Sequence, residues 1–378
     1  MKRIIICCDG TWQGPRDEHT NDAGLKVFKP SNPLKIFRAV KPLADDGKIQ
    51  VSFYDEGVGN SGNFLERIDG GVFAGGFLKN IEDAACFLIA NYQLGDDVYL
   101  FGFSRGAATV RSLTRFIDWA GGLPTKRDAY FLPELIDRYA DSEGDASEAK
   151  KLIQEIRNRP RTHLGEFRPA PIRFLGVFDT VLAVGSRLKV AITNSRMTSN
   201  RKHQFHVGES PATCVKTARH ALGIDERRKV FAAEVWKRPA FPQQSLQQRW
   251  FSGVHKNIGG GYPNDGLANF ALHWMAGEAI QADLDLDEDF LKFYHPFSGD
   301  QLYESLTHIY KVRGPRSRDL DAGSEANLEL HPSVFEVLNH QRADRNYIPK
   351  NLIAYLRQHP ALVERVDAEV RQRLGLGS

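Results

Sequence analysis

Short apolar or alternating runs, each bounded by polar or glycine residues, recur along the chain and predict β-strands. These strands are expected at 3–8, 49–54, 98–103, 172–178 and 248–254. Segments with helical character predict helices at 34–40, 78–92, 105–119, 146–157, 211–222, 267–280 and 360–374. Strands that alternate with helices form a mostly parallel central sheet with helices on both faces. The expected fold class is therefore α/β.

Three segments interrupt this alternation. Residues 57–76 are rich in glycine and predict a long functional loop. Residues 123–165 are polar and helix-prone and predict an inserted helical cap, while 185–208 carry several basic residues and predict a surface excursion. We expect an α/β-hydrolase core over 1–285 that contains these two insertions. A mixed helical extension over 286–378 is expected to pack on that core.

Composition narrows the class of protein. The 378 residues are 42% hydrophobic and 26% charged, which is typical of a globular protein with a sizeable core. The net charge is only +3 and no dense basic block contains interleaved aromatic residues, so no nucleic-acid partner is expected. No run approaches the ~20 apolar residues of a transmembrane segment. The apolar N-terminal run is too short for a signal peptide, so we expect a cytoplasmic protein, or one secreted without a signal peptide.

Cysteine and glycine patterns give no sign of a bound group. The cysteines lack Cys-x-x-Cys spacing, which predicts buried reduced thiols and neither a disulfide framework nor a metal site. They are Cys7, Cys8, Cys86 and Cys214. The glycine run at 259–261 lacks the P-loop lysine and the dinucleotide spacing, so a packing or turn role is favoured. No cofactor is predicted.

The segment with the clearest chemistry is Gly102-Phe-Ser104-Arg105-Gly106, between a predicted strand and a predicted helix. In that context a Gly-x-Ser-x-Gly turn predicts a nucleophile elbow, which exposes the serine hydroxyl on a tight backbone turn. The Arg105 N–H opens the helix and is a candidate donor to an oxyanion beside the serine. The alternative is an ordinary glycine-flanked serine in a βα turn.

Ser104, Asp179 and His255 each follow a predicted strand, and functional residues of parallel sheets gather beyond the carboxyl ends of strands. Their order along the chain is that of the α/β-hydrolases. A histidine activates the serine by accepting its proton, and a carboxylate orients the histidine. A second oxyanion donor is expected from the turn after the first strand, at Gly10, Thr11 or Trp12.

Other residues compete for these roles. We favour His255 because it is expected to close a strand and precedes the glycine run. Asp179 is favoured as the acid, and Asp9 is expected to be a structural hydrogen-bond acceptor. The competitors are His206, His220 and His273 for the base, and Asp9 and Asp55 for the acid.

Together these motifs resemble an α/β-hydrolase family that includes the bacterial type VI secretion lipase effectors of the GxSxG class. The matching segments are 6–12, 32–38, 54–59, 101–107, 174–180, 219–227 and 250–262. The resemblance implies an α/β-hydrolase core with Ser104, Asp179 and His255 as the triad, and phospholipase activity on membrane lipids. The chain departs from the family pattern at Asn257 and near Asn269, where acids are common. These departures affect a supporting contact or an ion site.

The leading hypothesis is a serine hydrolase of carboxylic esters, in particular a phospholipase or lipase that acts at a membrane surface. An immunity or secretion partner is expected if the protein is an effector. One alternative is a soluble esterase or thioesterase with a small acyl substrate. The other is a catalytically silent interaction module with the same fold.

Overall fold

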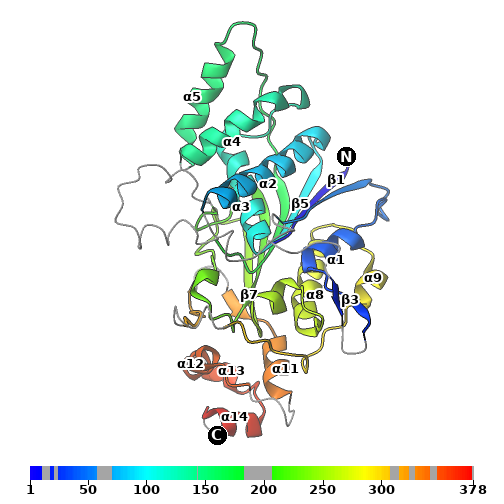
Figure 1. The fold of residues 1–378 in the computed structure, drawn as a ribbon, viewed down its shortest axis with the longest axis vertical. Helices are drawn as coiled ribbons and strands as arrows, with labels where there is room; N and C mark the ends of the chain where they lie inside the picture. The colour runs from blue at the N-terminus through cyan, green and yellow to red at the C-terminus, as the bar shows by residue number, and fades with distance from the viewer. Residues whose placement is uncertain are drawn as a thin grey trace.

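A parallel sheet forms the centre of the protein in this computed structural model (Figure 1). The structure describes residues 1–10, 18–20, 24–57, 70–142, 144–182, 207–306, 315–322, 328–340 and 347–376. Seven strands lie in the order β4-β1-β5-β6-β7-β8-β9, and each neighbouring pair is parallel. They are β1 (Arg3–Cys8), β4 (Gln50–Asp55), β5 (Asp97–Phe103), β6 (Ile172–Phe178), β7 (Val215–Gly223), β8 (Ser245–Phe251) and β9 (Leu328–Leu330). The predicted α/β class is confirmed.

Helices cover both faces of the sheet because its central strands are apolar on both sides. In β1, Ile4 and Ile6 join the core under α2–α5, whereas Ile5 and Cys7 join the core under α1, α8 and α9. The helices are α1 (Asn32–Ala39), α2 (Gly70–Asn91), α3 (Arg105–Ala120), α4 (Leu132–Asp141), α5 (Ala146–Arg157), α7 (His255–Gly259), α8 (Gly266–Gln281), α9 (Glu288–Lys292), α11 (Ser333–Asn339), α12 (Lys350–Gln358), α13 (Pro360–Val363) and α14 (Ala368–Leu374). A hairpin of β2 (Glu18–Thr20) and β3 (Lys26–Phe28) precedes α1.

The helix predicted at 211–222 is wrong, because residues 215–223 form β7 between β6 and β8. Alanine, lysine and leucine there favour a helix locally, but a place in the middle of the sheet overrides that weak preference. The predicted loop at 57–76 is also corrected in part, since α2 begins at Gly70. The helix predicted at 360–374 is two short helices, α13 and α14, which are separated by residues 364–367.

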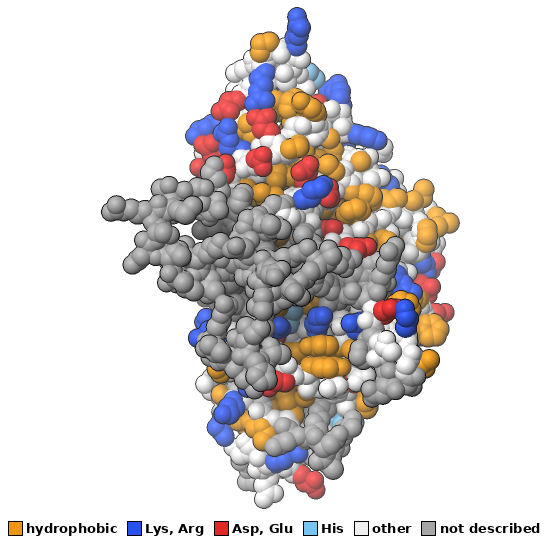
Figure 2. Space-filling view, in the orientation of Figure 1, with side chains coloured by type: hydrophobic (Ala, Val, Ile, Leu, Met, Phe, Trp, Pro, Cys, Tyr) orange, Lys and Arg blue, Asp and Glu red, His pale blue; other side chains and the backbone are white. Residues whose placement is uncertain are grey.

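The helical insertion consists of α4, α5 and a 3₁₀ turn at Lys126–Phe131. The Trp119 indole, at the end of α3 remote from Ser104, donates to the Asp145 carbonyl at 2.7 Å. The Tyr139 hydroxyl of α4 also donates to the Ser112 carbonyl at 3.4 Å. The insertion therefore packs from the middle of α3 to its far end, about 12 to 22 Å along the helix from the serine. Figure 2 shows basic and acidic side chains interspersed over this part, and Arg138 and Glu148 pair at 3.1 Å. Of the excursion at 185–208, residues 185–206 lie outside the described residues.

The C-terminal region does more than pack on the sheet. Its strand β9 pairs with β8 and so forms one edge of the sheet. Leu328 and Leu330 join a third apolar cluster with residues of β7, β8, α11, α12 and α14. This arrangement brings residues from the last part of the chain next to the carboxyl ends of β7 and β8.

Candidate active site

Ser104 occupies a strained turn between β5 and α3. Its backbone lies at φ 58° and ψ −119°, a conformation that costs free energy in a residue with a Cβ. The flanking glycines are required by space. A Cβ on Gly102 would lie 2.5 Å from the Gly106 carbonyl oxygen, and one on Gly106 would lie 2.1 Å from that of Cys8. The tight turn therefore depends on both glycines and on close contact with β1.

The structure brings Ser104, His255 and Asp179 together from three separate segments. The Ser104 Oγ lies 2.8 Å from His255 Nε2, and His255 Nδ1 lies 2.6 Å from Asp179 Oδ2. The expectation that His255 closes a strand is wrong, because β8 ends at Phe251 and the histidine is the first residue of α7. Its ring lies against those of Phe103 and Phe231, with centroids 4.6 and 4.8 Å away.

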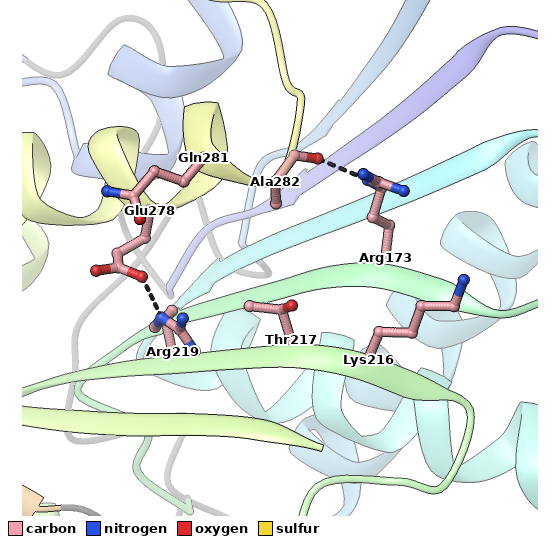
Figure 3. A pocket seen from close by; sticks show the side chains of 7 residues that line it. All are labelled: Arg173, Lys216, Thr217, Arg219, Glu278, Gln281 and Ala282. Carbon is pink, nitrogen blue, oxygen red and sulfur yellow. Dashed lines mark hydrogen bonds and ion pairs between the residues drawn. The ribbon is translucent and has the colours of Figure 1, made fainter. Parts of the chain in front are cut away.

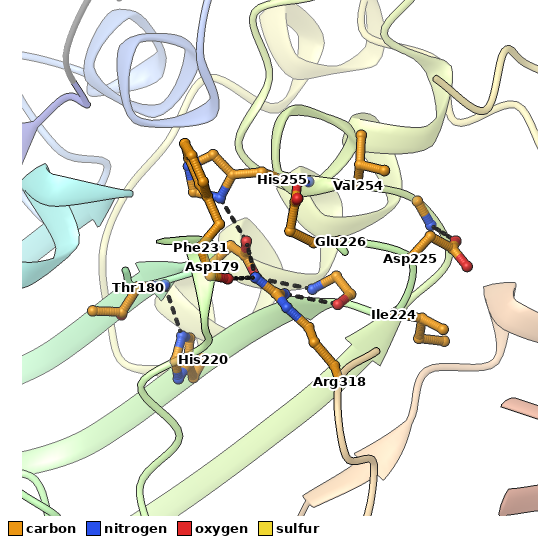
Figure 4. A network of polar contacts seen from close by, with 12 residues as sticks. Asp179, Thr180, His220, Ile224, Asp225, Glu226, Phe231, Val254, His255 and Arg318 are labelled. Carbon is orange, nitrogen blue, oxygen red and sulfur yellow. Dashed lines mark hydrogen bonds and ion pairs between the residues drawn. The ribbon is translucent and has the colours of Figure 1, made fainter. Parts of the chain in front are cut away.

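Arg318 completes the surroundings of Asp179, and the sequence analysis missed it. One guanidinium nitrogen pairs with Asp179 Oδ1, and the other donates to Oδ2 at 2.9 Å (Figure 4). The Gly223 N–H donates to the same carboxylate at 3.0 Å. Arg318 is only 7% exposed and Asp179 is fully buried. No local motif marks this arginine, which lies 139 residues beyond the aspartate.

These contacts set the protonation states of the acid and the base. Burial by itself raises the pKa of Asp179, but the Arg318 charge and the His255 hydrogen bond hold that pKa well below its ordinary value. Because the ionised carboxylate can only accept, His255 Nδ1 carries a proton and Nε2 is left to accept from the Ser104 hydroxyl. Burial lowers the pKa of His255 from 6.5, with Asp179 acting in the opposite direction. The imidazole is thus neutral near pH 7.

Residues in the segment after β7 contact the backbone of His255 and the Phe231 ring beside it. Glu226 accepts from the His255 backbone N–H at 3.3 Å and from the Arg228 side chain at 2.8 Å. The Arg228 guanidinium lies 3.6 Å from the centroid of the Phe231 ring, which in turn contacts His255. Asp225 accepts from the Gly253 N–H at 2.6 Å, just before α7. No role is predicted from the sequence for these charged residues, of which Figure 4 shows Asp225 and Glu226 beside His255.

Two of the candidate oxyanion donors lie beside the serine. Arg105 is the first residue of α3, directly after Ser104. A Cβ on Gly10 would lie 2.9 Å from the Ser104 Cβ and 3.4 Å from its Oγ, so the turn after β1 packs directly on the serine. Thr11 and Trp12 lie outside the described residues. The close approach of Gly10 requires a residue without a side chain.

The competing residues have other contacts. Asp9 accepts hydrogen bonds from the Ser31 and Tyr54 hydroxyls. His220 lies within hydrogen-bond distance of the Thr180 N–H and of Gln248, and burial lowers its pKa to about 3. The others are His273, which contacts the Tyr294 carbonyl, Asp55, whose pKa burial raises to about 7, and His206, which lies outside the described residues.

The two asparagines that depart from the family pattern have structural contacts. Asn257 Oδ1 accepts from the Val254 N–H at 3.2 Å and so stabilises the start of α7. Asn269 Oδ1 accepts from the buried Lys35 ammonium at 2.8 Å, and Lys35 also pairs with Asp265 at 2.7 Å. In the glycine run, a Cβ on Gly259 would overlap the Phe103 ring at 2.0 Å. These residues therefore shape the turn around His255.

A separate hollow lies at the amino ends of β6 and β7, remote from the serine (Figure 3). Its arginines are already paired, Arg173 with the Ala282 carbonyl at 2.7 Å and Arg219 with Glu278 at 2.5 Å. Within the ranges given above, no group of three or more His, Cys, Asp or Glu side chains is placed to hold a metal ion. No helix in the described part of the chain is long and apolar enough to cross a bilayer.

Several known proteins are similar to parts of this chain. The family model described as "T6SS, Phospholipase effector Tle1-like, catalytic domain" matches residues 2–278. An uncharacterized protein of Saccharomyces cerevisiae is 26% identical over 248 residues, which cover 61% of this chain and 32% of the yeast protein.

Two solved structures are also similar in part. An uncharacterized protein from Pseudomonas aeruginosa aligns with a TM-score of 0.42 and 17% identity, over 86% of this chain and 50% of that one. The Tle1 effector bound to the VgrG spike of the type 6 secretion system aligns with a TM-score of 0.37 and 19% identity, over 70% and 52%. The chain thus spans about half of each solved chain and about a third of the yeast relative.

Proposed function

The chain belongs to the Tle1-like phospholipase effector family over its catalytic domain, a family of ester-bond hydrolases, and we propose that Ser104, His255 and Asp179 are its catalytic triad. The observation that carries this proposal is the continuous contact from the Ser104 Oγ to His255 Nε2 at 2.8 Å and from His255 Nδ1 to Asp179 at 2.6 Å. The strained backbone of Ser104 supports the same role, since strain of this kind clusters at active sites.

In the proposed reaction the Ser104 Oγ attacks the carbonyl carbon of an ester while His255 Nε2 takes the hydroxyl proton. The carbonyl oxygen becomes an oxyanion, with the Arg105 N–H and the turn at Gly10 as the proposed donors. His255 then gives its proton to the leaving alcohol as the C–O bond breaks. A water molecule, deprotonated by the same histidine, attacks the acyl-serine, and the acid leaves as the bond to Ser104 Oγ breaks and His255 returns the proton to that oxygen. Asp179 stabilises the imidazolium that forms in each half of the cycle.

We further propose a glycerophospholipid as the substrate, taken at a membrane surface. The family description supports a phospholipase, and the His255 ring lies against the partly exposed ring of Phe231. An apolar ring beside the proposed base suits an acyl chain better than a polar substrate. A secretion partner and an immunity partner follow as proposals from the effector family.

The test compares wild type, Ser104→Ala and the control Ser147→Ala, whose serine is exposed at the start of α5. Each is assayed on phosphatidylcholine vesicles and on a monomeric short-chain ester, and each is labelled with a fluorophosphonate. We expect hydrolysis and labelling in wild type and Ser147→Ala, a loss of both in Ser104→Ala, and higher activity on vesicles.

Three other results would each revise the proposal. Full activity of Ser104→Ala would overturn the triad. Activity confined to the monomeric ester would favour a soluble esterase or thioesterase. A folded wild type that neither hydrolyses esters nor takes the label would favour the silent interaction module.

A further inference from the structure

We propose that Arg318 is a positioning residue for the reaction, which orients Asp179 and neutralises its charge so that His255 remains a free base. This inference rests on the proposed triad. Arg318 lies beyond residues 2–278, the part that matches the family model. It pairs with both carboxylate oxygens of Asp179, a two-point contact that fixes the plane of the carboxylate as well as its place.

The same guanidinium also hydrogen-bonds to two backbone carbonyls near the aspartate. It donates to the Gly223 carbonyl at 2.7 Å, at the end of β7, and to the Phe231 carbonyl at 2.9 Å. Gly223 in turn donates its N–H to Asp179, and the Phe231 ring lies against His255. One side chain therefore connects Asp179, the end of β7 and the residue whose ring lies against His255.

The segment that carries Arg318 is itself held firmly. The Arg316 N–H donates to the Arg227 carbonyl at 2.9 Å, and the Trp250 indole donates to the Leu320 carbonyl at 3.2 Å. In α12, Asn351 donates to the Arg318 carbonyl at 3.2 Å and to the Ile224 carbonyl at 2.9 Å. These contacts place the backbone of the arginine independently of its contact with Asp179.

The electrostatic consequence follows from the charges around the pair. The titratable groups packed around Asp179 and His255 are Arg318, His220, Asp225, Glu226 and Arg228. Glu226 and Arg228 neutralise each other, and His220 is uncharged near pH 7. Arg318 balances the charge of Asp179 directly beside the imidazole, whereas Asp225 accepts from the Gly253 N–H and the Tyr347 hydroxyl. Without Arg318 the carboxylate would be unbalanced, and a protonated imidazole would be favoured.

The test measures kcat and KM of the full chain against pH on a short-chain p-nitrophenyl ester. In wild type, burial of His255 predicts an acidic limb of kcat/KM below pH 6.5. For Arg318→Met we expect kcat to fall roughly 10- to 100-fold, as when a group that orients a ligating histidine is removed from a metal site. The acidic limb is expected to move up by about one pH unit or more, while KM changes little.

Two matched variants separate charge from geometry. Arg318→Lys keeps the charge but cannot span both oxygens, so we expect the wild-type acidic limb with a reduced kcat. Arg316→Met changes an exposed arginine two residues away and is expected to behave as wild type. If Arg318→Met fails to fold, Arg318→Lys decides the question, since a wild-type kcat in that variant would contradict the positioning role.

A double variant tests whether Arg318 acts through Asp179. We expect Arg318→Met to cause little further loss of kcat in an Asp179→Asn background, whereas independent roles predict that the two losses multiply. Folded Arg318→Met with wild-type kcat and an unmoved acidic limb would overturn this inference, provided that Ser104→Ala is inactive. Activity in Ser104→Ala would instead overturn the proposed function.

Discussion

Asp9 and Asp179 occupy equivalent positions at the ends of central strands, but the groups that contact them differ. Each follows a central strand, β1 or β6, and each is buried at the carboxyl edge of the sheet, with 2% and 0% exposure. Asp9 accepts from two hydroxyls, those of Ser31 and Tyr54. Asp179 instead contacts an imidazole and a guanidinium, which can carry charge.

The difference teaches that the donors around a buried carboxylate decide its chemistry more than its place at a strand end. Hydroxyl donors such as Tyr54, whose pKa is raised by burial and by the Asp9 charge, stay protonated and hold a loop. An imidazole donor can gain a second proton during a reaction, which the adjacent carboxylate stabilises. Four substitutions test this contrast.

The largest effect is expected when the two aspartates are changed to asparagine. In Asp179→Asn, the neutral amide no longer stabilises the imidazolium or selects the right tautomer, so kcat should fall on the order of 10⁴-fold. Asp9→Asn should cost far less, because Asp9 accepts from the Ser31 and Tyr54 hydroxyls, which hold a loop. Steady-state kinetics on the monomeric ester measures both. Equal losses in the two variants would contradict the division of roles.

A smaller effect is expected at Gly10, which follows Asp9 in the chain and packs directly on Ser104. In Gly10→Ala the new methyl group would lie 2.9 Å from the Ser104 Cβ, so the turn or the serine must shift. We expect kcat to fall roughly 10²-fold, the scale of losing one oxyanion donor. Gly277→Ala in α8 is the control, because nothing lies within 4 Å of its added Cβ. A fully active Gly10→Ala would exclude this turn from the reaction.

The smallest effect is expected from Tyr54→Phe, and it should appear in stability. The substitution removes the hydroxyl that donates to Asp9, a hydrogen bond to a charged group worth about 1.5 to 3 kcal/mol. Urea denaturation should show the free energy of unfolding reduced by about that amount. Activity should change little. Tyr130→Phe, at an 86% exposed tyrosine, is the control. A large loss of kcat without loss of stability would place Asp9 in the reaction.

The local parts of the fold and of the candidate site were predictable from the sequence. The turn at Ser104 has its glycines within two residues, and apolar runs marked five strands of the sheet because buried parallel strands need such runs. β7 was not predictable, since its alanines and basic residues suit a helix and only its neighbours β6 and β8 impose a strand.

Arg318 could not be found in the sequence for a different reason. It is one of many arginines, it lies in a polar stretch, and its contact with Asp179 depends on β8 and α12, whose side chains hold that stretch against the sheet. Tertiary contacts between distant segments leave no periodic or local signal. The same holds for Glu226 and Arg228, which support His255 from another strand end.

The distance along the chain between Asp179 and Arg318 has a consequence for biosynthesis. Domains generally form from the N-terminal side as the chain leaves the ribosome. Ser104, Asp179 and His255 all emerge before Arg318, which follows the aspartate by 139 residues. A nascent chain that ends before Arg318 has Ser104, Asp179 and His255 but not the cation beside Asp179, so the candidate site is complete only after Arg318 has emerged.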